Sequence, residues 1–255
     1  MKPSLRPAIG AAKSSIWLPS DVPGLVAEFY SEFVIKNGGN LVSQWTDRSG
    51  EGNHATQTVA TNKPLWVDAQ INGYPSIRHD GIDNFLSIDS LATILDGNDT
   101  PFTWFGVFKL LGGLGDADAL WGVGLSSSSI PFMDFITYDY GDGTKYHLRR
   151  RDEGGAALLR ASGGTPDTTA WHYAILTFSG TTVSLWVDGV KVIDEAALDG
   201  DSLGILDNFA LGAATRAGPL SYFNMEYAAK GFYDNAISGP NVTLLNTFLA
   251  TKYGL

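Results

Sequence analysis

Apolar and polar residues alternate with a period of two through most of the chain, in short runs separated by turn residues. The run 182–187 shows the pattern clearly, because its odd-numbered positions are apolar and share one face of an extended chain, whereas Ser184 and Trp186 share the other. Asp188-Gly189 follows at once, and this pair accepts the positive φ angles of a tight turn. The pattern therefore predicts that 171–179 and 182–187 form a β-hairpin, with a second turn after it.

Similar runs recur at short intervals, with glycine, aspartate and asparagine between them. The run FTWFGVFKL at 102–110 is apolar at nearly every position, as expected of a strand buried on both faces. Other strand-like runs lie at 24–30, 41–47, 75–89, 119–125, 131–139, 144–151, 156–162, 208–214 and 225–235. Many short strands with few helices predict an all-β sandwich or barrel. No internal linker is visible, so one domain is expected from residue 24 to residue 255.

The segment 238–255 has the pattern of a helix instead. Ser238 suits the N-cap, Pro240 the first turn and Gly254 a left-handed end. The expected apolar face consists of Leu244, Leu245, Phe248 and Leu249. We expect a structural helix that packs across an edge or a face of the sheet.

Composition and charge narrow the function. The formal net charge of −10 argues against nucleic-acid binding, which needs clustered Lys and Arg. The absence of cysteine excludes disulfides and thiolate metal sites. The sequence contains no run of 18 apolar residues, so no membrane helix is predicted, and its first residues lack the apolar stretch of a secretory signal. Residues 1–23 hold four prolines and three basic residues against one acid, which predicts an extended N-terminal arm, either loose or lying on a partner.

Four ordered segments resemble one family. They are VSQWTDRSGEGNHATQ (42–57), PSIRHDGIDNFLSI (75–88), WHYAILTFSGTTVSLWVDGVKV (171–192) and FLATKYGL (248–255). Together they resemble laminin-G-like domains of the concanavalin A-like lectin and glucanase superfamily, of the bacterial and bacteriophage type. The resemblance implies an all-β, two-sheet antiparallel jelly-roll sandwich with a short C-terminal helix and an extended N-terminal arm.

The same resemblance argues against catalysis. Glucanases of the superfamily carry a Glu-x-Asp-x-x-Glu strand that supplies an acid and a nucleophile. None of the six glutamates begins such a motif, and the segment YHLRRR lacks the partner strands of an alginate lyase. No His-Glu-x-x-His motif occurs. We therefore expect no enzymatic activity, with a diverged polysaccharide hydrolase or lyase as an alternative.

Two candidate sites follow from the residues and the resemblance. Members of the superfamily often bind Ca²⁺ through loop oxygens, which makes Asp80, Asp83 and Asn84 the metal candidates, although turn chemistry alone is the favoured explanation of these residues. No other cofactor is expected. For carbohydrate, the predicted site is an exposed face with His147, Arg149 and Arg151 on one strand and Tyr138 and Trp186 as aromatic groups. The alternatives for these basic residues are ion pairs with neighbouring acidic strands or a subunit contact.

The combined expectation is a structural protein of a bacteriophage particle, either a head decoration or a tail-associated protein, with weak glycan adhesion. A lectin-like domain without a secretory signal has no evident route to extracellular glycans. A phage protein reaches them when the host cell is lysed. Residues 1–20 are expected to contact other virion proteins, and the chain to be oligomeric or part of a larger assembly located in the virion. A free carbohydrate-binding lectin, located extracellularly, is the second interpretation.

Overall fold

The computed structural model describes residues 17–97, 99–112, 114, 118–155 and 158–255. Over these residues the protein is all-β apart from one C-terminal helix and short 3-10 turns, as the alternating pattern predicts. Within the same ranges hydrogen bonding joins 17 strands into one continuous sheet, and two further strands form a small separate pair. No helix in these ranges combines the length and the apolar character needed to cross a membrane.

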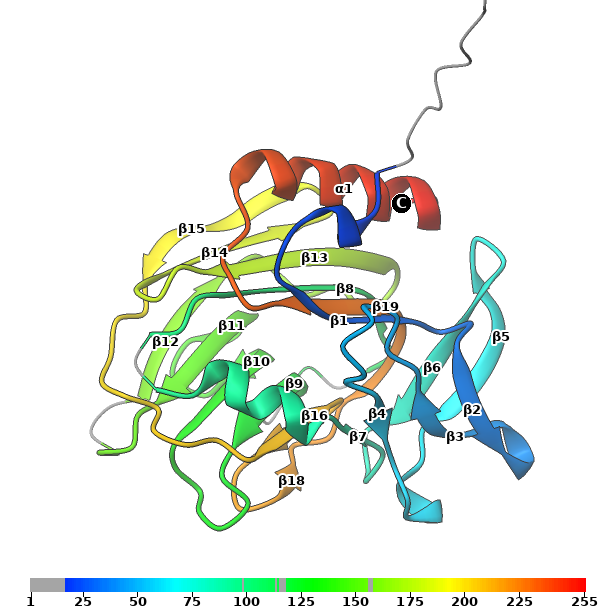
Figure 1. Cartoon of the computed structure of the whole chain (residues 1–255), viewed down its shortest axis with the longest axis horizontal. Helices are drawn as coiled ribbons and strands as arrows, with labels where there is room; N and C mark the ends of the chain where they lie inside the picture. Colours follow the sequence, from blue (N-terminus) through cyan, green and yellow to red (C-terminus); the bar gives the residue numbers. More distant parts are fainter. Residues whose placement is uncertain (1–16, 98, 113, 115–117, 156–157) are drawn as a thin grey trace, which may run out of the picture.

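Six strands form the half of the sheet that lies beneath the helix, and we call it the helix-side half (Figure 1). They pair antiparallel in the spatial order β15–β14–β13–β8–β19–β1. Their bounds are β1 Leu25–Tyr30, β8 Phe102–Leu110, β13 Trp171–Phe178, β14 Thr182–Val187, β15 Val190–Ala197 and β19 Asn224–Tyr233.

Five strands form the opposite half, which we call the far half. They pair antiparallel in the order β12–β11–β10–β9–β16. Their bounds are β9 Ala119–Gly124, β10 Phe132–Asp139, β11 Gly143–Arg151, β12 Leu158–Gly163 and β16 Asn208–Leu211. The small pair β17 Ala214–Thr215 and β18 Pro219–Leu220 packs against β9.

Short strands bridge the two halves. The ladder runs from β19 through β6, β5, β3, β4 and β7 to β16, and β2 adds to β3. Their bounds are β2 Val34–Asn37, β3 Leu41–Trp45, β4 Ala55–Thr56, β5 Leu65–Ile71, β6 Tyr74–Asp80 and β7 Leu86–Ser87. Short 3-10 turns lie at η1 Pro19–Asp21, η2 Gly38–Asn40, η3 Ala60–Asn62 and η4 Asp89–Leu95.

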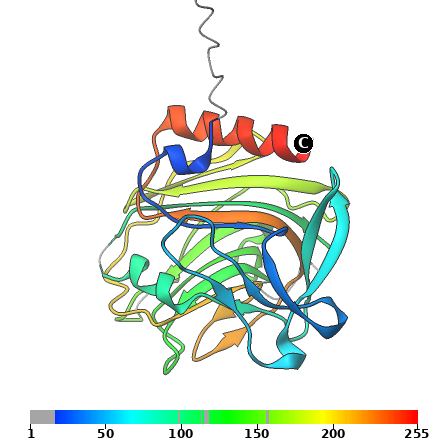
Figure 2. The same cartoon turned by 45° about the vertical axis from the view of Figure 1, so that its right-hand side comes forward.

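The sheet is nearly closed on itself, like a barrel. Its end strands β12 and β15 lie against each other, so closely that a Cβ on Gly163 would clash with the carbonyl oxygen of Val192. Figure 2 shows the strands wrapped around one interior. The predicted two-sheet jelly-roll sandwich is therefore not confirmed, whereas the all-β class and the C-terminal helix are. The bridging strands β4 and β7 have two residues each, too few to show an alternating pattern in the sequence.

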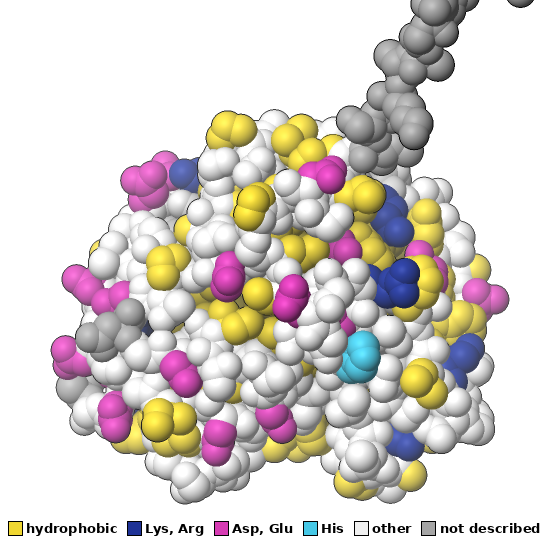
Figure 3. All heavy atoms as spheres, viewed as in Figure 1, with side chains coloured by type: hydrophobic (Ala, Val, Ile, Leu, Met, Phe, Trp, Pro, Cys, Tyr) yellow, Lys and Arg dark blue, Asp and Glu magenta, His cyan; other side chains and the backbone are white. Residues whose placement is uncertain are grey.

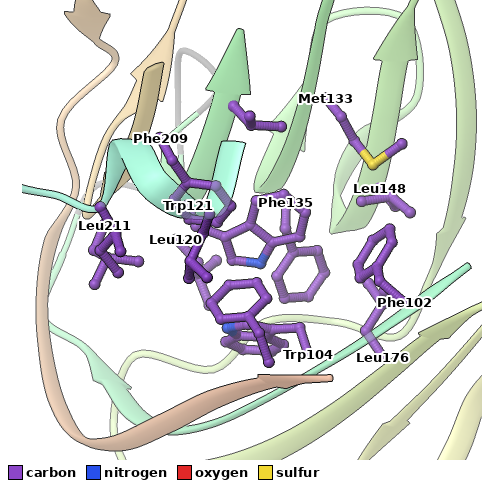
Figure 4. Packing of buried hydrophobic residues seen from close by; sticks show 14 of the residues in the cluster. Phe102, Trp104, Leu120, Trp121, Met133, Phe135, Leu148, Leu176, Phe209 and Leu211 are labelled. Atoms are coloured by element: carbon purple, nitrogen blue, oxygen red, sulfur yellow. The ribbon is translucent and has the colours of Figure 1, made fainter. Parts of the chain in front are cut away.

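The interior is filled by aromatic and aliphatic side chains from both halves (Figure 4). Trp45, Trp104 and Trp121 are completely buried there. The ring centroids of Trp104 and Phe135 lie 5.1 Å apart, and those of Trp121 and Phe232 lie 5.9 Å apart. These contacts join the helix-side half to the far half, and burial of such large side chains is the main stabilising contribution.

Lys230 enters this interior from β19. Its side chain is completely buried, and its Nζ lies 3.3 Å from the ring centroid of Tyr227 and 5.4 Å from that of Trp45. No hydrogen-bond partner for Nζ is found within the described part of the chain. Burial therefore holds the pKa of Lys230 well below its ordinary value and favours the neutral amine.

The predicted hairpin is present as β13 and β14, followed by a tight turn to β15. Asp188 and Gly189 have φ angles of 49° and 77°, as the Asp-Gly pair predicts. The Asp188 carboxylate also accepts a hydrogen bond from the backbone N–H of Tyr173 and lies 2.6 Å from Nδ1 of His172. His172 is thus a structural residue of the turn, and its hydrogen bond to Asp188 raises its pKa.

The helix α1, Gly239–Tyr253, covers the outer face of the helix-side half (Figure 1). Gly254 ends it with a φ of 70°, as predicted, but Ser238 makes no side-chain cap. The buried face is Val242, Leu245, Leu249 and Tyr253. The predicted face was therefore partly wrong: Leu244 is 42% exposed and Phe248 is only partly buried, because the buried positions follow a spacing of three and four that starts at Val242.

The described end of the N-terminal arm packs on its own domain. Trp17 makes an edge contact with Phe248, with ring centroids 6.0 Å apart. The carbonyl of Pro19 accepts a hydrogen bond from the hydroxyl of Tyr233, and Val22 is buried. Residues 1–16, on which most of the predicted partner contact depends, lie outside the described part of the chain.

Candidate functional site

The predicted basic strand is β11, and His147, Arg149 and Arg151 share its outer face because Tyr146 and Leu148 point into the core. The expected exposure was wrong for two of them. His147 is completely buried and Arg149 is 4% exposed. Arg151 is partly exposed, and its guanidinium donates to the carbonyl of Gly155.

Arg149 is buried because aspartates on the neighbouring strand pair with it. Its Nε and Nη2 donate to the two carboxylate oxygens of Asp134 on β10, each at 2.8 Å. Its Nη1 donates to Asp139 at 2.9 Å. The register places Asp134 directly opposite Arg149, so the fork meets the carboxylate in the bidentate geometry that makes such pairs strong.

Two further arginines extend this pairing. Arg216, from the β17–β18 turn, donates through Nη2 to Asp134 at 2.9 Å, and Arg160 on β12 places Nη2 3.4 Å from Asp139. The five side chains form an alternating series, Arg216–Asp134–Arg149–Asp139–Arg160, which we call the arginine–aspartate row. It runs across the outer face of the far half and carries one positive charge in excess.

The charged groups at the centre of the row stabilise one another. Burial opposes ionisation of Asp139, but hydrogen bonds from Arg149 and from the backbone N–H of Gly141 outweigh burial and hold the pKa of this carboxyl below its ordinary value. Burial also opposes the charge of Arg149, yet Asp134 and Asp139 raise its pKa. The pKa of His147 is lowered, chiefly by burial. Asp139 and Arg149 therefore remain charged at neutral pH, and Arg149 donates to both Asp134 and Asp139.

The ends of the row are accessible. The side chains of Arg160 and Arg216 are 34% and 27% exposed. Nε of Arg216 is buried and has no partner among the described residues, and the guanidinium carbon lies 3.9 Å from the ring centroid of Phe132, so the accessible part of this group is its Nη end. Each end thus keeps N–H groups that its aspartate does not use.

Tyr138 lies near the row at the end of β10, and its ring meets that of Tyr140 edge-on with centroids 5.4 Å apart. Tyr140 is 78% exposed. The prediction that Trp186 joins this face was wrong. Trp186 packs with the cluster beneath α1, whereas its neighbour Leu185 points into the interior, so Trp186 lies across the core from the row.

The predicted metal residues form a turn. Oδ1 of Asp80 accepts backbone N–H groups from Ile82, Asp83 and Asn84, at 2.9 to 3.4 Å. The side-chain amide of Asn84 donates to Thr61 and to Asp83. Within the described ranges no group of three His, Cys, Asp or Glu side chains is placed to hold a metal ion. The geometry matches the alternative of turn chemistry.

Sequence reasoning missed Asp134, Asp139, Arg160 and Arg216 as members of the site. One signal was present, because Asp134 is a charged residue in the middle of the apolar run PFMDFITYD. A carboxylate at such a position requires a buried cation, and the LRRR segment supplies it.

Comparison with known proteins matches no family model and no curated protein. Solved structures do match. The binding domain of Paraclostridial Mosquitocidal Protein 1 has a TM-score of 0.60 at 14% identity, covering 90% of this chain and 53% of that one. A Trypanosoma rangeli sialidase bound to a difluoro-KDN has a TM-score of 0.54 at 14% identity, covering 97% and 36%. A NanB sialidase mutant from Streptococcus pneumoniae has a TM-score of 0.51 at 20% identity, covering 66% and 27%.

The likeness is one of fold. This chain spans only about a quarter to a half of the length of each of these proteins. The expected place in the concanavalin A-like superfamily is corrected by two findings: the matching structures are sialidases and a binding domain, and the strands form one nearly closed sheet. The expectation of no enzymatic activity is also corrected, because the fold occurs within sialidases, although identities of 14–20% establish no activity here.

Proposed function

We propose that this chain is a carbohydrate-binding domain that takes an acidic sugar on the arginine–aspartate row. The observation that carries the proposal is the excess guanidinium. Three arginines share two aspartates, and the two terminal arginines, Arg160 and Arg216, remain partly exposed. A planar guanidinium matches a carboxylate in two parallel hydrogen bonds, which a neutral sugar does not offer.

Two further features support this ligand class. The exposed ring of Tyr140, held edge-on to Tyr138, offers a flat apolar surface beside the row, and such surfaces suit sugar rings. The fold is shared with a sialidase solved with a difluoro-KDN and with the binding domain of Paraclostridial Mosquitocidal Protein 1. The net charge of −10 repels an anion at long range, so attraction must be local and must weaken as salt screens it.

The test compares sialyllactose with lactose by titration calorimetry at low and high salt. We expect sialyllactose to bind more tightly, and Arg160→Gln and Arg216→Gln each to weaken it about tenfold, the loss of one charge-assisted hydrogen bond. Arg78→Gln is the matched control, because Arg78 is a 40% exposed arginine that pairs with Glu226 away from the row. Equal binding of both sugars, no binding of either, or indifference to both row substitutions refutes the proposal.

The structural role in a bacteriophage particle, the contact with virion proteins, the oligomeric state, and a virion or extracellular location stay predictions from the sequence. The diverged hydrolase or lyase also stays one.

A further inference from the structure

A groove of about 390 Å³ runs along the solvent side of α1. Its lining includes Leu244 and Phe248 on α1 and Tyr74 at the start of β6. Trp17 also lines the groove, and its ring contacts that of Phe248 edge-on. Leu244 is 42% exposed, and apolar side chains reach the surface over α1 in Figure 3. The helix thus presents a second apolar strip besides the face that it buries on the sheet.

Lys252 is the one charged residue among those that line the groove, and its ammonium group already has partners within the protein. Its Nζ lies 4.2 Å and 4.7 Å from the ring centroids of Tyr30 and Tyr74, and 3.5 Å from Oε1 of Glu32. The hydroxyl of Thr247 donates to the carbonyl of Thr243 within the helix. A sugar would leave its hydroxyl groups unpaired in such a groove, whereas apolar peptide side chains fit it.

We propose that residues 1–16 of the same chain bind in this groove. They end at Trp17, which lines it, so the tether holds them there at an effective concentration in the millimolar range. They carry Lys2, Arg6 and Lys13 and no acid, whereas residues 17–255 hold 14 basic and 27 acidic residues, a net charge of −13. Leu5 and Ile9 supply the apolar side chains.

The assay is limited trypsin digestion of the full chain, with release of residues 1–13 followed by mass spectrometry. Lys2 and Arg6 each precede a proline, which blocks trypsin, so Lys13 is the single cleavable site in the segment. A bound segment is cut only when it opens, so the rate reports the bound fraction. We expect Phe248→Ser in the groove and Ile9→Ser in the segment each to speed release about tenfold.

Ile82→Ser is the control, because Ile82 is a 74% exposed apolar residue on a loop outside the groove lining, and it should leave the rate unchanged. Circular dichroism verifies that each variant is folded. Release at one rate in all variants and in a free peptide of residues 1–16 overturns the proposal. Protection that grows with protein concentration also overturns it, since the occupant is then the segment of a second copy.

Discussion

Replacement of Lys230 by methionine tests the buried amine directly. Methionine has a similar length and no polar atom, so Lys230→Met keeps the packing against Tyr227 and Trp45 while it removes an unpaired polar group. An unsatisfied buried polar group costs about 1–3 kcal/mol, so we expect the variant to be more stable than the wild type by about that amount at high pH, where the amine is neutral in both states, and by more at neutral pH, where folding also removes its proton.

The pH dependence gives the sharper result. Burial lowers the pKa of Lys230, so between its folded pKa and its ordinary value the unfolded chain holds a proton that the folded chain lacks. Stability of the wild type therefore rises with pH across this window by about 1.4 kcal/mol per pH unit, and Lys230→Met loses this contribution. The stability advantage of the variant should therefore be smaller at pH 9.5 than at pH 8.

Urea unfolding, followed by tryptophan fluorescence at pH 8 and at pH 9.5, measures the difference. Lys63→Met is the control, because Lys63 is a partly exposed lysine that donates a hydrogen bond to Asn37. The free energy of unfolding of this variant should change between the two pH values as much as that of the wild type. If Lys230→Met also runs parallel to the wild type, the amine has a buried partner or stays charged, and the reasoning is refuted.

Two further outcomes are expected. Asp134→Ala leaves the buried guanidinium of Arg149 with only Asp139, so the free energy of unfolding should fall by about 3 kcal/mol; a loss below 1 kcal/mol in chemical denaturation contradicts the buried pairing. His172→Gln should lower the free energy of unfolding by about 1 kcal/mol or less at pH 5.5, and by a smaller amount at pH 8.5. The pKa of His172 is raised in the folded protein, so its contribution to stability is present below the ordinary pKa and disappears as pH rises through the folded value. Melting curves in which the effect of the substitution grows with pH contradict this expectation.

Local sequence was sufficient for elements whose determinants are adjacent in the chain. The hairpin after Trp171 follows from alternation plus Asp188-Gly189, and the end of α1 follows from Gly254. It was insufficient for side chains whose surroundings come from distant strands. Arg149 was expected at the surface, but it is buried because it pairs with the carboxylate of Asp134. Asp134 lies 15 residues earlier, on the paired strand, so the local sequence around Arg149 does not reveal it.

The same reason explains the two errors about shape. Trp186 was grouped with Tyr138 because each has the right parity on its own strand, yet parity does not say on which side of the core a strand lies. The bridging strand β4 has two residues and no periodicity of its own, and its pairing with β3 and β7 defines it. Closure of the sheet is therefore a property of pairing, which the sequence pattern does not contain.

The position of β19 has a consequence for the order of folding during synthesis. This strand, Asn224–Tyr233, is made after all the strands that it pairs with, which are β8 on one side and β6 and β1 on the other. A nascent chain that stops before Asn224 exposes unpaired edges on three earlier strands, which invites aggregation. We therefore expect the yield of folded protein to depend on chaperones that cover these edges until residues 224–233 have been made.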